Sequence, residues 1–232
     1  MAVIHRTTLT PGKLELLAPW LPTRPWYVGT GREPELTKAG GFRLDDPEGE
    51  VGIEFMVVTD TSGETPLSYH VPLTYRGAPL DGAEQGLVGT LEHGVLGTRW
   101  VYDGTHDPVL VAQLLSFLQG RAEAQAQSVS DTPDPSVARH FTGDGLSAEV
   151  ASLTVDDDGD DDGQRGTTVV VGTVAGSLTL QVTRVLSPEP EPEQRTPGTG
   201  TTEALGHVTA GWRLPDGSEG RAPFVLLSDT VR

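Results

Sequence analysis

The stretch WYVGTGR, which begins at Trp26, combines residue types that hold phosphates or sugars. Arg32 carries a guanidinium that can bind a phosphate or carboxylate through two hydrogen bonds, and Trp26 and Tyr27 carry aromatic faces that stack on sugars. The Gly29-x-Gly31 spacing is too short for a dinucleotide-binding loop, and a Pro-rich turn precedes it. The residues alone favour a structural interpretation: two buried aromatic anchors beside a sharp turn whose glycines supply positive φ.

A second candidate is the acidic run DDDGDDDG, in which Asp158, Asp160, Asp162 and Gly163 match the first half of a calcium-binding loop. The twelfth position should supply a bidentate carboxylate, but it is Val169, so we expect a solvated loop with weak cation binding. The six histidines are scattered, and no His-Glu-x-x-His, Gly-x-Ser-x-Gly or Walker motif occurs. The residues therefore predict no metal site and no catalytic constellation.

The bulk composition excludes several classes of partner. The chain has 232 residues and a formal net charge of −17, which repels nucleic acids and anionic membranes because both are bound through Lys and Arg. No apolar run approaches the roughly 20 residues that span a bilayer, and the first residues lack the apolar stretch of a signal peptide. We expect a soluble cytoplasmic protein. There is no cysteine, no asparagine, and only Lys13 and Lys38 as lysines.

The first half should combine a short helix with antiparallel strands. Thr10 is a plausible N-cap with Pro11 at the first helical position, and Pro19 should end the helix early. Residues 51–59 read as a largely buried strand. In residues 67–75, Pro72 predicts an edge strand or a bulge, and His70 lies opposite the apolar face and is expected at the surface. The next expected elements are strands at 86–92 and 97–102, and a helix capped by Asp107 that begins at Pro108.

The second half reads as β structure. The expected strands cover residues 146–155, 167–174, 177–186, 206–214 and 220–228, with turns at Ala175-Gly176 and Asp216-Gly217. Residues 187–202 have no apolar periodicity and are rich in Pro and Glu, which predicts a mobile loop.

Three motifs resemble the N-terminal cap domain of actinobacterial maltokinases and related aminosugar kinases. They are Trp-Leu-Pro leading into Trp-Tyr-x-Gly-x-Gly-Arg at 20–32, Tyr-x-Val-Pro-Leu-x-Tyr at 69–75, and Arg-Trp-Val-Tyr-Asp leading into His-Asp-Pro at 99–108. The resemblance covers about residues 8–120. It implies a small α+β domain with a curved antiparallel sheet packed on helices, similar to a cystatin fold. In that family the cap sits on the N-lobe of a kinase that phosphorylates maltose or an aminosugar with ATP and Mg²⁺.

The second half is similar to the N-lobe hairpin of those kinases, with one important departure. The family pattern Leu-x-Leu-Lys-x-Phe-Arg aligns with LTLQVTR at 178–184, so Gln181 stands where the ATP-binding lysine is expected. A neutral amide cannot pair with nucleotide phosphates. No C-lobe, His-Gly-Asp loop or metal-holding Asn is found in the sequence. We therefore expect no kinase activity, no catalytic residue and no cofactor.

The predicted organisation follows from the resemblance and the composition. Residues 1–127 form a cap-like α+β domain, residues 128–145 a linker, and residues 146–232 a β-rich, N-lobe-like domain that contains the mobile loop 187–202.

Three functions stay open at this point. The favoured one is a non-catalytic protein that regulates or docks on a kinase or another enzyme of trehalose or α-glucan metabolism. The second is a binding module in which Trp26, Tyr27, Arg32 and Trp100 line a sugar-phosphate or nucleotide pocket. The third is an enzyme of glucan metabolism, for which no nucleophile and acid pair stands at a recognisable spacing.

Overall fold

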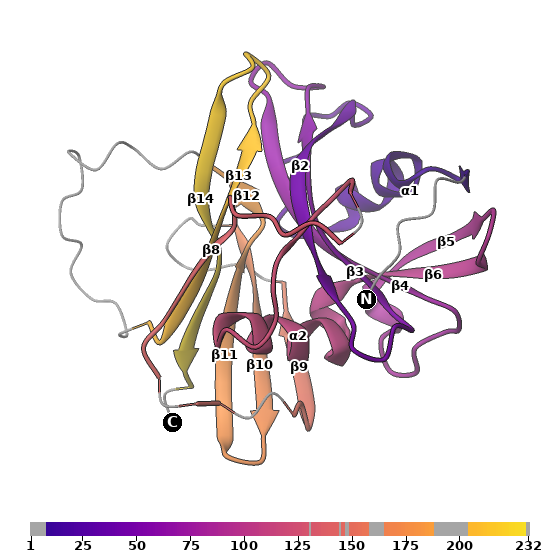
Figure 1. Ribbon diagram of the computed structural model, residues 1–232. Helices are drawn as coiled ribbons and strands as arrows, with labels where there is room; N and C mark the ends of the chain where they lie inside the picture. The colour runs from indigo at the N-terminus through magenta and orange to yellow at the C-terminus, as the bar shows by residue number, and fades with distance from the viewer. Residues whose placement is uncertain are drawn as a thin grey trace, which may run out of the picture.

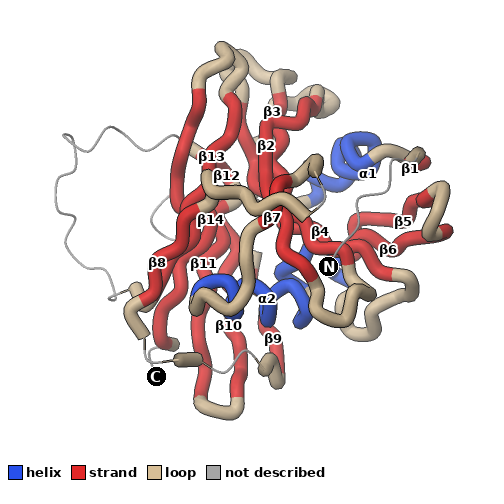
Figure 2. The backbone as a smooth tube through the Cα atoms, in the orientation of Figure 1, coloured by secondary structure: helices blue, strands red, loops and turns tan. Residues whose placement is uncertain are grey.

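An open antiparallel sheet dominates the protein, and helices are few (Figure 1 and Figure 2). The computed structural model describes residues 8–129, 131–143, 145–146, 149–157, 165–187 and 204–230. The helices are α1 (Lys13–Trp20) and α2 (Pro108–Leu118), with 3-10 turns at Leu21–Thr23, Glu84–Gly86 and Gly104–His106. The strands are β1 (Leu9–Thr10), β2 (Leu36–Asp45), β3 (Gly52–Asp60), β4 (Leu67–Arg76), β5 (Leu87–His93), β6 (Gly97–Asp103), β7 (Gln125–Ala126), β8 (Ala138–Phe141), β9 (Ser152–Asp156), β10 (Gly166–Thr173), β11 (Gly176–Thr183), β12 (Val185–Leu186), β13 (Gly206–Arg213) and β14 (Glu219–Asp229).

The strands of both halves are connected in one sheet. Their order is β1-β5-β6-β4-β3-β2-β13-β14-β11-β10-β9, and β12, β7 and β8 pair with β4, β2 and β13. Two strand pairings join the halves in the described part of the chain: β13 meets β2 at Trp212 and Gly40, and β12 pairs with β4. Segments that are far apart in the sequence therefore lie side by side at these two places.

The two helices cover opposite faces of β3. Its residues Ile53, Phe55 and Val57 belong to a large core with α2, β2 and the strands of the second half. Met56 and Val58 belong to a smaller core with α1, the Trp26 region, β4 and β5–β6. The expectation that this strand is largely buried is confirmed. Because the larger core draws side chains from both halves, burial of apolar surface holds the halves together.

Strand β4 corrects the prediction made for Pro72. Pro72 lies inside the sheet, opposite Phe55 of β3, and not at its edge. On its other side β4 pairs with β12 at Ser68 and Tyr69 and with β6 from Leu73 onward, so Pro72 falls in the gap between two partners. There its missing N–H removes no ladder bond.

Helix α1 begins later and ends later than the sequence indicates. Thr10 pairs with β5 as part of β1, so Gly12 becomes the N-cap, and its N–H donates to Glu15 Oε2 at 2.7 Å. Pro19 lies within the last turn, and the chain continues beyond Trp20 into a 3-10 turn. A proline in the last turn removes one hydrogen bond and does not displace the rest of the helix.

Other predicted elements are confirmed. Asp107 caps α2 by accepting from the N–H of Val109 at 2.9 Å, and Pro108 occupies the first turn. The strands of the last hairpin are present, with Gly217 at φ +87° in the turn. Strand β9 covers only the last part of the expected 146–155 segment. Strands β2 and β8 were not predicted.

Residues 158–163 of the acidic run, which include the calcium-loop candidates, and most of the expected mobile loop at 187–202 lie outside the described residues. Neither described helix has the length and apolar character that crossing a bilayer requires.

Candidate functional site

A buried arginine joins the cap-like motifs to the second half of the chain. Arg184, directly after β11, has a side chain with no exposed surface, and its Nη2 lies 2.6 Å from Asp103 Oδ2. Its Nε donates to Thr167 Oγ1 at 2.7 Å, and its guanidinium lies 4.9 Å from the ring of Trp26. Asp103 supplies the counter-charge that a buried cation needs, and Nη2 also donates to Thr105 Oγ1 at 3.3 Å, whereas Nη1 has no hydrogen-bond partner among the described residues. We call Arg184, Asp103, Thr105 and Thr167 the arginine cluster.

Local hydrogen bonds orient the carboxylate of Asp103, which is the acceptor in this cluster. Asp103 ends β6 and caps the following 3-10 turn, because its Oδ1 accepts from the backbone N–H and the hydroxyl of Thr105. Its other oxygen is left for Arg184. A few residues on, Asp107 accepts two hydrogen bonds from Arg76 at 2.6 and 2.7 Å. Both aspartates of the motif that runs from Arg99 to Pro108 therefore hold buried or half-buried arginines.

His70 was predicted at the surface, and this prediction is wrong. Its side chain is fully buried, with ring centroids 4.4 Å from Phe224 and 6.0 Å from Phe55. Nδ1 lies 3.0 Å from the carbonyl oxygen of Thr183, so this nitrogen carries the proton and donates. Burial, followed by the nearby charge of Arg184, lowers the pKa of His70 to about 3. The polar face of β4 is buried at His70 because Phe224 of the second half packs on its ring.

The four residues of the predicted ligand pocket are divided between the core and the surface. Trp26 is 1% exposed and Tyr27 8%, and they pack between α1 and the sheet, as the anchor interpretation predicts. Arg32 is exposed and donates to the carbonyl oxygen of Ser62 at 3.3 Å, while Trp100 is half-buried on β6. The faces of the two anchors are occupied by protein.

The anchors have specific partners within the core. Trp26 contacts Trp20 edge to face at 5.9 Å, and Tyr27 stacks on Tyr69 at 5.3 Å. The Tyr27 hydroxyl donates to Asp60 at 2.7 Å, and burial raises the pKa of Tyr27 well above its ordinary value. Of the two glycines that follow, Gly31 has φ +73°, whereas Gly29 is not in the positive region. The expectation of positive φ therefore holds for one of them.

Gln181, at the expected lysine position, is exposed on β11 between β10 and β14. Arg184, three residues further on, is turned into the arginine cluster. Among the described residues no group of His, Asp or Glu is arranged to hold a metal ion.

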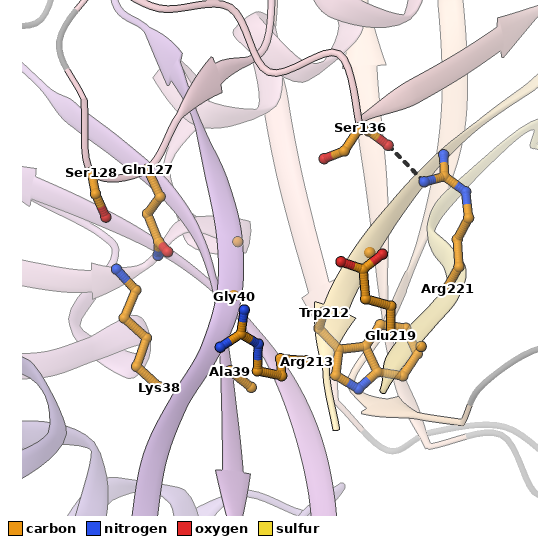
Figure 3. Close-up of a pocket in the computed structure, with 13 residues that line it drawn as sticks. Lys38, Ala39, Gly40, Gln127, Ser128, Ser136, Trp212, Arg213, Glu219 and Arg221 are labelled. Atoms are coloured by element: carbon orange, nitrogen blue, oxygen red, sulfur yellow. Dashed lines mark hydrogen bonds between the residues drawn. The ribbon is translucent and has the colours of Figure 1, made fainter. Parts of the chain in front are cut away.

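A separate polar groove lies where β2 meets the β13–β14 hairpin (Figure 3). Its cavity volume is about 740 Å³. Lys38 extends from β2 toward Gln127 and Ser128, and Arg213 extends from the end of β13 (Figure 3). Neither Lys38 nor Arg213 forms an ion pair or a side-chain hydrogen bond with any of the described residues. Arg221 also lines the groove and donates to the carbonyl oxygen of Ser136 at 2.7 Å.

A buried carboxylate stands behind this groove. Glu54 is 3% exposed and accepts from Lys13 at 2.5 Å, from the Tyr75 hydroxyl at 2.7 Å and from Gln127 at 2.7 Å. Burial alone would raise the pKa of Glu54, but Lys13 and these hydrogen bonds lower it below its ordinary value. Gln127 therefore connects the buried Glu54 to the wall of the groove. Burial, the largest cause, lowers the pKa of Lys38 below its ordinary value.

Sequence reasoning missed Arg184, His70 and Glu54 as key residues. Glu54 carried a usable signal, because a single carboxylate in the apolar run VGIEFMVV must find a buried partner. Arg184 carried a weaker signal, as the final residue of the N-lobe-like pattern. The groove had no local signal, since its walls come from three segments, 38–41, 127–136 and 211–221, that are more than 70 residues apart in the sequence.

Comparison with known families agrees with the three motifs of the first half. Residues 20–107 match the family model of the maltokinase N-terminal cap domain, which is less than half of the chain. A search of curated proteins returned no match. The matched segment runs from the last residue of α1 to Asp107 and contains Trp26, His70 and Asp103. Over residues 20–107, the chain is thus similar to the maltokinase N-terminal cap domain.

Proposed function

We propose that this protein is a non-catalytic, maltokinase-cap-like protein that docks on a kinase or another enzyme of trehalose or α-glucan metabolism. The observation that carries the proposal is the pair Gln181 and Arg184 in one strand segment. The position expected for the nucleotide-binding lysine holds a neutral, exposed amide, whereas the arginine three residues on is fully buried against the cap-like segment. Contacts between the two halves are kept, and the fixed charge that pairs nucleotide phosphates is absent from this position.

In this proposal the cap-like segment is a cystatin-like unit that packs on an N-lobe-like second half in the cytoplasm. The contacts between the two halves support this arrangement. The arginine cluster, the bond from His70 to Thr183 and the β4–β12 pairing all connect the family-like motifs with the segment that is similar to the kinase hairpin.

Exposed apolar side chains define a surface at which the proposed docking can be tested. Leu87, Val95 and Leu96 lie within the cap-like segment, on β5 and on the turn that follows it, and are 39%, 59% and 46% exposed. Val174, in the β10–β11 turn, is 76% exposed but lies outside the matched segment. It provides a matched control for a surface substitution of the same kind.

The test is affinity capture from the native cytosol, followed by direct binding to each purified carbohydrate kinase that is captured. We expect a kinase or enzyme of glucan metabolism to bind the wild-type chain, and the Val95→Ser, Leu96→Ser double variant to bind at least tenfold more weakly. The Val174→Ser variant should bind as the wild type does. Capture without any protein of carbohydrate metabolism, or equal loss in both variants, would count against this proposal.

The exposed arginine of the predicted ligand pocket favours a second candidate function. Arg32 is accessible beside Ser62, near the start of β4, so the phosphate of a sugar phosphate or a nucleotide has a cation to contact. Trp100 is half-buried opposite Arg76, at the other end of β4, so it does not share that ligand. Thermal-shift measurements with sugar phosphates and nucleotides test this candidate. Stabilisation should disappear in the Arg32→Ala variant, and a shift that survives this change excludes the assignment.

A further inference from the structure

We propose that the groove between β2 and the β13–β14 hairpin binds a small phosphorylated molecule. The proposal is independent of docking on a kinase, and its site shares no residue with the pocket predicted around Arg32. It rests on unpaired cations, on a floor built from backbone, and on neutral polar groups at the rim (Figure 3).

The charge of the groove is opposite to that of the chain. The whole chain carries a formal charge of −17, but Lys38, Arg213 and Arg221 line this groove against one carboxylate, that of Glu219. Arg221 is engaged with the carbonyl oxygen of Ser136, while Lys38 and Arg213 have no ion-pair partner among the described residues. Two cations that line one groove without an ion-pair partner are groups that a phosphate dianion would neutralise.

The floor of the groove is built largely from backbone. Glycines 40, 41, 211 and 220 line it, so much of its surface is backbone without side chains. Gly40 and Gly41 have φ +159° and +124° at the bulge of β2, where the ladder to β3 shifts its register. A Cβ at Gly41 would lie 2.1 Å from the carbonyl oxygen of Phe55, so the bulge itself requires glycine, and backbone atoms are left at the surface of the groove.

The size of the groove and the negative charge of the protein exclude a large polyanion as the ligand. A nucleic acid or an anionic membrane would face the whole negative surface, whereas a small phosphate ester meets only the local cations. The cavity of about 740 Å³ has room for a phosphorylated monosaccharide. Its hydroxyl groups would lie near the neutral polar side chains of Gln127, Ser128 and Ser136.

Calorimetry on the full chain tests the site, with glucose 6-phosphate, inorganic phosphate and glucose as probes. We expect glucose 6-phosphate to bind and glucose not to bind. Lys38→Ala and Arg213→Ala should each weaken binding at least tenfold. Arg121→Ala removes an equal charge from an exposed position outside the groove and should leave binding unchanged. Phosphate binding as tightly as the ester assigns recognition to the phosphate group alone, and weaker phosphate binding extends recognition to the rim.

The two lysines of the chain provide a second readout that does not depend on variants. Reductive ¹³C-methylation labels the side-chain amines of both lysines and keeps their charge. Adding glucose 6-phosphate should shift the Lys38 signal and raise the pKa of Lys38, while the signal of Lys13, which is bound to Glu54, stays in place. Absence of binding by either phosphate probe would overturn the proposal. So would binding that Arg32→Ala abolishes and the groove variants do not affect.

Discussion

Arg184 and Asp103 form an ion pair of 2.6 Å in the protein interior, although they are 81 positions apart in the sequence. Their side chains are 0% and 2% exposed. Asp103 belongs to the segment that matches the maltokinase cap, and Arg184 closes the strand that is similar to the kinase hairpin. The pair therefore ties the family-like segment to the rest of the fold, and a change at either residue should act on stability.

Replacing Arg184 with Met should lower the free energy of unfolding by about 3–5 kcal/mol, because Asp103 is then left as an uncompensated buried charge. Chemical unfolding followed by circular dichroism measures this. The double variant Arg184→Met, Asp103→Leu should recover much of the loss, since no lone charge remains. Arg213→Ala, at an exposed position, should change stability by at most about 0.5 kcal/mol. Additive losses in the double variant would contradict the pairing.

Stability should fall as the pH falls below about 6.5, partly because of His70. The folded chain has a His70 pKa of about 3, against the ordinary 6.5, so between these values the unfolded chain binds a proton that the folded chain does not. Each pH unit in this window should cost up to about 1.4 kcal/mol, and above it His70 contributes no slope.

The variant His70→Gln isolates the contribution of His70 to the pH dependence of stability. Glutamine can still donate to the carbonyl oxygen of Thr183, but it does not titrate. Unfolding free energies measured between pH 7 and pH 5 should show a shallower slope for the variant than for the wild type. Parallel curves would mean that His70 is protonated in the folded protein.

Truncation of Trp26 to Ala should cost about 3–5 kcal/mol, because the ring is 1% exposed and packs on Trp20 and the guanidinium of Arg184. Trp100→Ala removes a ring of the same size from a half-buried position and should cost less. Thermal unfolding of the two variants side by side provides the comparison. An equal loss in both would show that Trp26 is no special anchor.

The bulge of β2 should tolerate no side chain at Gly41. A Cβ there would lie 2.1 Å from the carbonyl oxygen of Phe55, at φ +124°, so Gly41→Ala should cost roughly 1–3 kcal/mol from the backbone strain alone. Gly29→Ala meets nothing within 4 Å and should leave stability within about 0.5 kcal/mol of the wild type. Urea midpoints measure both, and a tolerated Gly41→Ala would mean that the bulge can rearrange.

Local patterns predicted the elements that depend on local chemistry. The cap of α2 by Asp107 with Pro108, the buried run of β3 and the last hairpin were all visible in the sequence, because capping, apolar runs and turn residues act over a few positions. The anchor role of Trp26 was predicted for the same reason.

The remaining features depend on distant contacts. His70 was assigned to the surface because its strand alternates, but Phe224 of the second half packs on the polar face as well. Strand β2 was missed because two glycines interrupt its apolar pattern, and its pairing with β3 compensates for their low strand propensity. The groove of Lys38 and Arg213 exists only once β2 and β13 meet.

Sugar-dependent formation of ADP from MgATP by the purified chain tests the central claim most directly. The substrates to assay are maltose and an aminosugar. With a neutral Gln181 at the expected lysine position, we predict no ADP above the level of the buffer. Formation of ADP that requires both the sugar and the protein would contradict the account of a non-catalytic cap-like protein.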